Sequence, residues 1–118
     1  MEKFSVTMSI SGEYLTTVRL TVGGLCALVG ADVDTAEDYK VCVTESLLLL
    51  KRSGYTQAEL VFGVGEKLTF TVTGLTATGE TEESIEDEIS KALLSALLCE
   101  IRFIEDEHGK LTKIAFEG

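Results

Sequence analysis

The segment Thr35–Ser53 constrains the fold most, because its apolar residues occupy most sides of the helix that their spacing predicts. Asp34 or Thr35 can cap this helix, and its acidic start and basic end complement the helix dipole. Two apolar stripes run along it: Ala36, Tyr39, Val43, Leu47 and Leu50, with Cys42, Leu48 and Leu49 beside them. A helix that is apolar on most sides is buried on most sides. We therefore expect a central helix, in which Glu45 stands out.

Alternation of apolar and polar residues predicts the strands that cover this helix. In Phe4–Ile10 every second residue is apolar, which is typical of a half-buried strand. The same alternation predicts one hairpin with a Gly65-Glu66 turn and a second with His108-Gly109 in its turn. The four strands of these two hairpins are Leu60–Val64, Leu68–Thr73, Ile101–Glu105 and Leu111–Glu117. Gly74–Thr81 is predicted to be a loop.

Helical spacing predicts two more helices, Tyr14–Gly30 and Glu82–Cys99. In the second of these the expected buried stripe consists of Ile85, Ile89, Ala92, Leu93, Ala96 and Leu97. The resulting order is β-α-α-β-β-α-β-β, with no repeat and no linker over residues 1–118. We therefore expect a single α+β domain, a two-layer sandwich of an antiparallel or mixed sheet with its helices on one face.

Charge and cysteine content exclude several classes of protein. The net charge of −10 repels phosphates, which argues against nucleic-acid binding and against adhesion to anionic lipid. No stretch approaches the roughly 20 apolar residues of a membrane-spanning helix, so we expect no membrane association. Cys26, Cys42 and Cys99 are widely spaced, which argues against a disulfide framework or a zinc site. A reducing cytoplasm fits this pattern.

Within the central helix, Glu37–Ser46 reads E-D-Y-K-V-C-V-T-E-S, and Lys51–Tyr55 follows as K-R-S-G-Y. This motif resembles the central helix of the histidine-kinase-like (GHKL) ATPase superfamily, and most closely that of the short bacterial anti-sigma-factor serine kinases. Their helix reads roughly E-D-x-K-x-A-V-x-E-A-x-x-N-A-x-x-H-A-Y, and the predicted element order is similar over nearly the whole chain. The resemblance implies the histidine-kinase-like ATPase fold and places Glu45 where the family has its general base.

The residues that would hold nucleotide in that family are missing. Four residues after the glutamate the family has an asparagine that binds Mg²⁺, and here this position is Leu49 in a chain without any asparagine. The aspartate of the family's D-x-G-x-G motif falls on Thr73 or Gly74. Where the family cradles phosphates with a glycine-rich segment, residues 80–88 contain six acids. Those acids are either a solvated surface or a docking surface for a basic partner.

These losses predict a degenerate nucleotide site. We expect no catalytic residue, with Glu45 as a vestigial base, and no metal or cofactor in a vestigial pocket formed by Glu45, Leu49, Thr73 and Gly74. Leu49 is expected to fill the space of the nucleotide. The resemblance then implies a kinase-like, regulatory protein-binding domain rather than an ATPase, with a sigma factor or an anti-anti-sigma protein as partner. It also implies a homodimer through Phe4–Ile10.

Two alternatives stay open from the sequence. The first is an active anti-sigma serine kinase that binds ATP and Mg²⁺ in a divergent pocket. The second is a purely structural dimerisation module.

Overall fold

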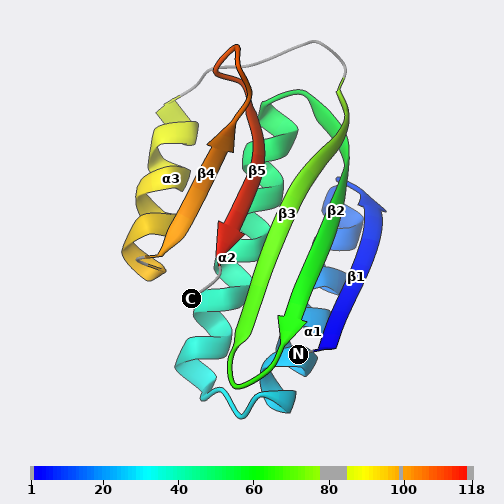
Figure 1. Ribbon diagram of the computed structural model, residues 1–118, viewed down its shortest axis with the longest axis vertical. Coiled ribbons are helices and arrows are strands. Elements are labelled where there is room, and N and C mark those ends of the chain that lie inside the picture. Colours follow the sequence, from blue (N-terminus) through cyan, green and yellow to red (C-terminus); the bar gives the residue numbers. More distant parts are fainter. Residues whose placement is uncertain (1, 78–84, 99, 117–118) are drawn as a thin grey trace.

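The computed structural model describes residues 2–77, 85–98 and 100–116. Within these residues the chain forms five strands and three helices (Figure 1). In chain order they are β1 (Glu2–Ser9), α1 (Gly12–Leu28), α2 (Val33–Arg52), β2 (Tyr55–Val64), β3 (Leu68–Ala77), α3 (Ile85–Leu97), β4 (Ile101–Glu105) and β5 (Leu111–Phe116). The predicted loop Gly74–Thr81 therefore begins later than expected, since β3 continues to Ala77. Its remainder lies outside the described residues, as do the predicted first residues of α3 and Cys99.

The five strands form one sheet in the order β1-β2-β3-β5-β4, and all its described pairings are antiparallel. All three helices lie against the same face of this sheet (Figure 1). Helix α2 occupies the middle, where it contacts α1, α3 and the strands β2, β3 and β5. The structure is thus an α+β arrangement of two layers, as the sequence predicts.

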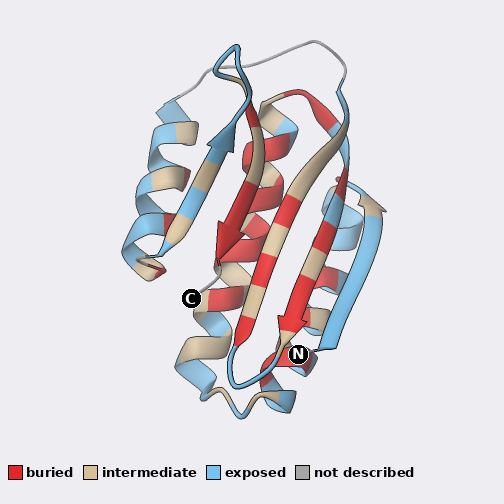
Figure 2. Ribbon diagram, viewed as in Figure 1, coloured by how far each residue is buried: buried red, intermediate tan, exposed pale blue. Residues whose placement is uncertain are grey.

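The core lies between α2 and the middle strands (Figure 2). Val43, Leu47 and Leu50 of α2 are completely buried, which confirms that this helix is central. An aromatic cluster closes the core, with the Tyr39 and Phe116 rings 5.5 Å apart and the Phe70 and Phe116 rings 5.7 Å apart. Offset and tilted ring pairs of this kind add about 0.5–1.5 kcal/mol beyond the burial of their area.

Helix α2 begins two residues earlier than its sequence signals suggest, at Val33 rather than Thr35. The cap is Asp32, whose carboxylate accepts a hydrogen bond from the Thr35 backbone N–H at 2.7 Å, so the prediction of Asp34 or Thr35 is wrong. This bond lowers the pKa of Asp32. Asp32 can cap because its backbone is extended, whereas Asp34 already lies within the helix.

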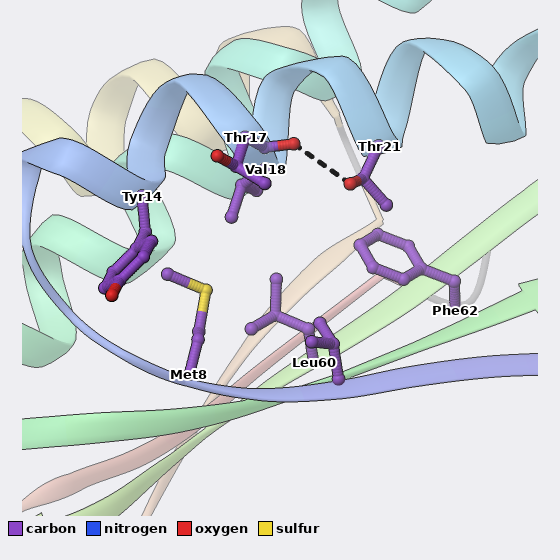
Figure 3. Close-up of a pocket in the computed structure, with 8 residues that line it drawn as sticks. Met8, Tyr14, Thr17, Val18, Thr21, Leu60 and Phe62 are labelled. Carbon is purple, nitrogen blue, oxygen red and sulfur yellow. Dashed lines mark hydrogen bonds between the residues drawn. The ribbon is translucent and has the colours of Figure 1, made fainter.

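Strand β1 is more exposed than a half-buried strand. Phe4 is 44% and Val6 38% exposed, although both face the helices. The reason is topological: β1 is an edge strand, and only α1 lies behind it (Figure 1). The incomplete cover leaves an apolar hollow of about 150 Å³ between β1, β2 and α1, into which Met8 and Tyr14 project (Figure 3).

Helix α3 contradicts the predicted burial. Of the expected buried stripe, Ile85 is 74%, Ile89 63% and Leu93 37% exposed, and both alanines are exposed as well, whereas Leu97 is half-buried and packs against the core as expected. The buried residues of this helix are instead Ser90 and Leu94. The helical period correctly predicts an apolar face on α3, but most of that face points away from the core, because the opposite face buries Leu94 and makes polar contacts with α2.

Candidate functional site between α2 and α3

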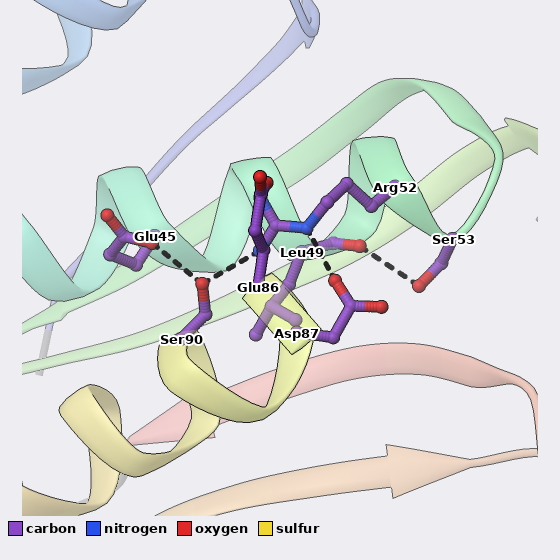
Figure 4. Close-up of polar contacts among 7 residues, drawn as sticks. All are labelled: Glu45, Leu49, Arg52, Ser53, Glu86, Asp87 and Ser90. Carbon is purple, nitrogen blue, oxygen red and sulfur yellow. Dashed lines mark hydrogen bonds and ion pairs between the residues drawn. The ribbon is translucent and has the colours of Figure 1, made fainter. Parts of the chain in front are cut away.

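The structure brings two of the four predicted pocket residues together. Glu45 and Leu49 are one turn apart on α2, on the side that α3 covers (Figure 4). Gly74 lies on β3, opposite Ala58 of β2 and against the ring of Tyr55. Thr73 lies on the other face of the sheet, where it lines a hollow of about 470 Å³. Thr73 and Glu45 therefore cannot contribute to one nucleotide site in this arrangement.

Glu45 is engaged by α3. Its Oε2 accepts a hydrogen bond from Ser90 Oγ at 2.9 Å, and Ser90 Oγ in turn accepts one from Arg52 Nη2 at 2.7 Å. Ser90 is only 5% exposed, so both contacts are largely shielded from water. The carboxylate thus anchors a neighbouring helix through a serine.

Arg52 joins the two helices with a second set of contacts. Its Nε donates to Asp87 Oδ1, and its Nη1 lies 3.9 Å from Glu86 Oε2. The Arg52 and Asp87 side chains are 17% and 21% exposed. A partly buried charge pair loses several kcal/mol of hydration, which its own attraction and hydrogen bonds must offset, so each partner depends strongly on the other. We refer to Glu45, Arg52, Asp87 and Ser90 as the α2–α3 polar cluster.

Leu49 lies on the same surface of α2 as Glu45 and Arg52. It lies between Glu45 and Arg52 along the helix, under the first turns of α3, and is 1% exposed (Figure 4). A hydrocarbon side chain can neither bind Mg²⁺ nor accept a hydrogen bond from a nucleotide. Neither of the two hollows described above is lined by Glu45 or Leu49.

Gly74 has a packing role. A Cβ built there would lie 2.5 Å from Cγ of Tyr55 and 2.6 Å from both of its Cδ atoms. The Tyr55 ring therefore covers the strand where glycine leaves room, and Lys110 Nζ lies 4.7 Å from the centre of that ring. Burial raises the pKa of Tyr55, and the negative charge of Asp106 adds to the rise.

The two described cysteines are buried and chemically quiet. Burial raises the pKa of Cys42 to about 12, with smaller contributions from Asp38 and Glu45, and burial also raises the pKa of Cys26. The reactive form of cysteine is the thiolate, so neither thiol is a nucleophile at neutral pH.

The described residues contain no group of three or more His, Cys, Asp or Glu side chains placed to hold a metal ion. Nor does any helix among them have the length and apolar character needed to cross a membrane. Comparison with known proteins gave no relative: no family model matches the chain, and no curated protein matches it.

Sequence reasoning missed the partners of Glu45. Arg52 follows Glu45 by two helical turns, so the two side chains share one face of α2. Asp87 and Ser90 are three residues apart on α3, on the side opposite the apolar stripe. A polar face of a helix normally faces water, so the sequence favours burial of the apolar face of α3. The buried face also carries Leu94, which is completely buried.

Proposed function

We propose that this chain is a degenerate histidine-kinase-like domain of the anti-sigma-factor kinase type. It does not hydrolyse ATP, and it acts in the cytoplasm by binding proteins in transcriptional or stress regulation. The observation that carries this proposal is the position of α3, which packs on the face of α2 that bears Glu45 and Leu49 and ties Glu45 to Ser90.

The fold assignment is supported by the motif in α2 and by the arrangement around it. Three helices and an antiparallel five-stranded sheet in two layers are compatible with the fold that the resemblance implies. The helix that carries the motif is the central one, and it packs on the middle of an antiparallel sheet.

The loss of nucleotide binding is supported by the chemistry of the contact between α2 and α3. Ser90 already occupies an oxygen of Glu45, and an apolar side chain stands where the family binds its metal. Asp87 and Glu86 add negative charge to the same surface. With Glu45 these acids outnumber the single positive charge of Arg52, so the net charge of this surface is negative and repels a triphosphate.

Isothermal titration with ATP and Mg²⁺ tests the proposal. We expect no binding heat at about 100 µM protein, whereas a dissociation constant of micromolar order would overturn the proposal and favour the active kinase. Leu49→Asn restores the family's metal ligand to the sequence. We still expect no ATP binding from it, and about 2–4 kcal/mol lower stability because its amide is buried without partners. Leu28→Asn is the matched control, since Leu28 is 73% exposed.

The regulatory role requires a partner. We infer that the chain forms a homodimer through the exposed edge of β1 and binds a sigma factor or an anti-anti-sigma protein. Affinity purification of the full chain from its native host, with mass spectrometry of the recovered proteins, tests the second step. Recovery of such a regulator supports the proposal, and reproducible recovery of none favours the purely structural dimerisation module.

A further inference from the structure

The outer face of α3 is an apolar surface. Ile85, Ile89 and Leu93 follow one another at four-residue spacing and are 74%, 63% and 37% exposed. Ala92 and Ala96 continue this face, and both are exposed. We call these five residues the α3 stripe. Scattered exposed apolar residues are normal, but a contiguous stripe along one helix is typical of an interaction surface.

Polar contacts hold the α3 stripe outward. On the opposite side of the helix, Ser90 bonds to Glu45 and Arg52, and Asp87 bonds to Arg52 (Figure 4). A rotation of α3 that buried the stripe would break these bonds and leave Arg52 and Glu45 facing an apolar surface. Uncompensated charges of this kind cost several kcal/mol. The α2–α3 polar cluster therefore keeps the α3 stripe facing outward.

The charges beside the stripe select its partner. Glu86 and Glu88 lie in the first turn of α3, on either side of Ile85 around the helix, and both are exposed. Lys91 is turned toward β4, with its Nζ 5.8 Å from the centre of the Phe103 ring. The surface thus offers apolar contacts bordered by negative charge, which complements a partner with apolar side chains bordered by lysine or arginine.

A second copy of this chain fits the stripe poorly. In an antiparallel pair of α3 helices, Glu86 and Glu88 of one copy would face the last turn of the other α3, which contains no basic residue. In a parallel pair the acidic ends would face each other. Each copy also carries a net charge of −10, which opposes association through an acidic surface.

We propose that the α3 stripe is the docking site for a basic amphipathic helix of another protein. The inference rests on the proposed protein-binding function and adds the surface and the chemistry of the partner. The stripe runs from Ile85 to Ala96, or about 17 Å of helix, which suits three turns of a partner helix. Its spacing matches the anchor pattern of helix-in-groove and helix-on-helix recognition.

A pair of synthetic peptides tests the docking site on the full chain. One peptide is an amphipathic helix of about 16 residues with leucines on one face and lysines along its borders, and the other carries glutamates in place of the lysines. We expect the lysine peptide to bind with a dissociation constant of micromolar order and the glutamate peptide not to bind. The double variant Ile89→Ser/Leu93→Ser should weaken binding by at least about tenfold.

Matched variants separate the stripe from general attraction to an acidic protein. Leu20→Ser removes an apolar side chain that is 73% exposed on α1 and should leave binding unchanged. Glu88→Gln should weaken binding about two- to fivefold, and more than Glu13→Gln at the start of α1. Equal binding by the stripe variant and the Leu20 variant would overturn the proposal, as would no binding at about 1 mM peptide.

Different results test which molecule binds the α3 stripe and whether the proposed function is right. A wild-type dimer that Ile89→Ser/Leu93→Ser converts to monomer would identify a second copy as the occupant and overturn the inference. If a regulator recovered from the host binds wild type and this variant equally, the docking site is wrong but the proposed function stands. If ATP binds while the stripe behaves as expected, the proposed function falls and the docking site stands.

Discussion

At the scale of single residues, Gly74 shows how a position can fit a family motif and yet have a different role. The resemblance puts Thr73 or Gly74 at the aspartate position of the D-x-G-x-G motif, whereas in the structure the ring of Tyr55 lies directly over Gly74. Motif spacing carries no information about which side chain from another strand covers a glycine. The close approach comes from the pairing of β2 with β3, which brings the start of one strand to the end of the other.

We expect Gly74→Ala to destabilise the fold by about 1–3 kcal/mol, because the new methyl group overlaps the Tyr55 ring and forces it to move. Urea unfolding measures this change. Gly24→Ala is the control, since a Cβ at this helical position meets nothing within 4 Å. It should raise stability by about 0.5–1 kcal/mol. Equal stability of Gly74→Ala and wild type would show that the ring packs elsewhere.

At the scale of elements, the approximate position of each helix and strand along the chain could be predicted, although β2 begins at Tyr55 rather than Leu60. The buried side could be predicted for some elements and not for others. In α2 the apolar stripes cover most of the surface, so the buried side was clear from periodicity. In α3 either face could have packed against α2. The face that does so carries Asp87 and Ser90, which bond to Arg52, and Ser90 also bonds to Glu45. In β1 alternation predicted one buried side, but alternation does not show that the strand lies at the edge of the sheet, where α1 covers it only partly.

The α2–α3 polar cluster should fix the position of α3. We expect Arg52→Ala to lower stability by about 1–3 kcal/mol, since Ser90 loses a donor and Asp87 is left partly buried without its charge partner. Arg52→Lys should recover little of this loss, because an ammonium group cannot reproduce the fork that reaches both partners. Lys51→Ala, at the exposed neighbouring position, serves as control. Thermal or urea unfolding in which all three variants match wild type would contradict this role.

The cap of α2 should make stability depend on pH. The hydrogen bond from Thr35 lowers the folded pKa of Asp32 below its value in the unfolded chain, which is about 3.9. The folded state then binds fewer protons, so this contribution is present above the unfolded pKa and is lost as pH falls through the folded pKa. Asp32→Asn keeps a neutral cap that does not titrate. The difference in melting temperature between wild type and Asp32→Asn should therefore narrow between about pH 5 and 3. A difference that stays constant over this range would argue against the cap.

At the scale of the whole molecule, the sheet has two edges of unequal character. Strand β4 is short, whereas β1 is longer, exposed along almost its whole length, and backed by the apolar hollow against α1. An exposed edge strand of this kind is a template for pairing with another chain. This asymmetry supports β1 as the site of the proposed homodimer, and it leaves the α3 stripe, beside the opposite edge, accessible in the dimer.

One backbone position can test that dimer without disturbing the fold. Ile10 N–H donates to Thr56 O at 2.9 Å, and alternate residues of a strand point their backbone groups to the same neighbour. Met8 therefore pairs with β2, while the N–H of Thr7 points to the open edge. Thr7→Pro should remove a donor needed only for dimerisation, because proline is tolerated where the N–H faces outward.

Light scattering at about 0.1 mM should accordingly give a dimer mass for wild type and a monomer mass for Thr7→Pro, with similar melting temperatures once the protein is dilute. Met8→Pro is the contrasting variant, since its N–H belongs to the pairing with β2 and its loss should destabilise the monomer itself. A monomeric wild type would rule out the β1 dimer. A dimeric Thr7→Pro would move the interface elsewhere, and the α3 stripe would then be the first surface to examine as its site.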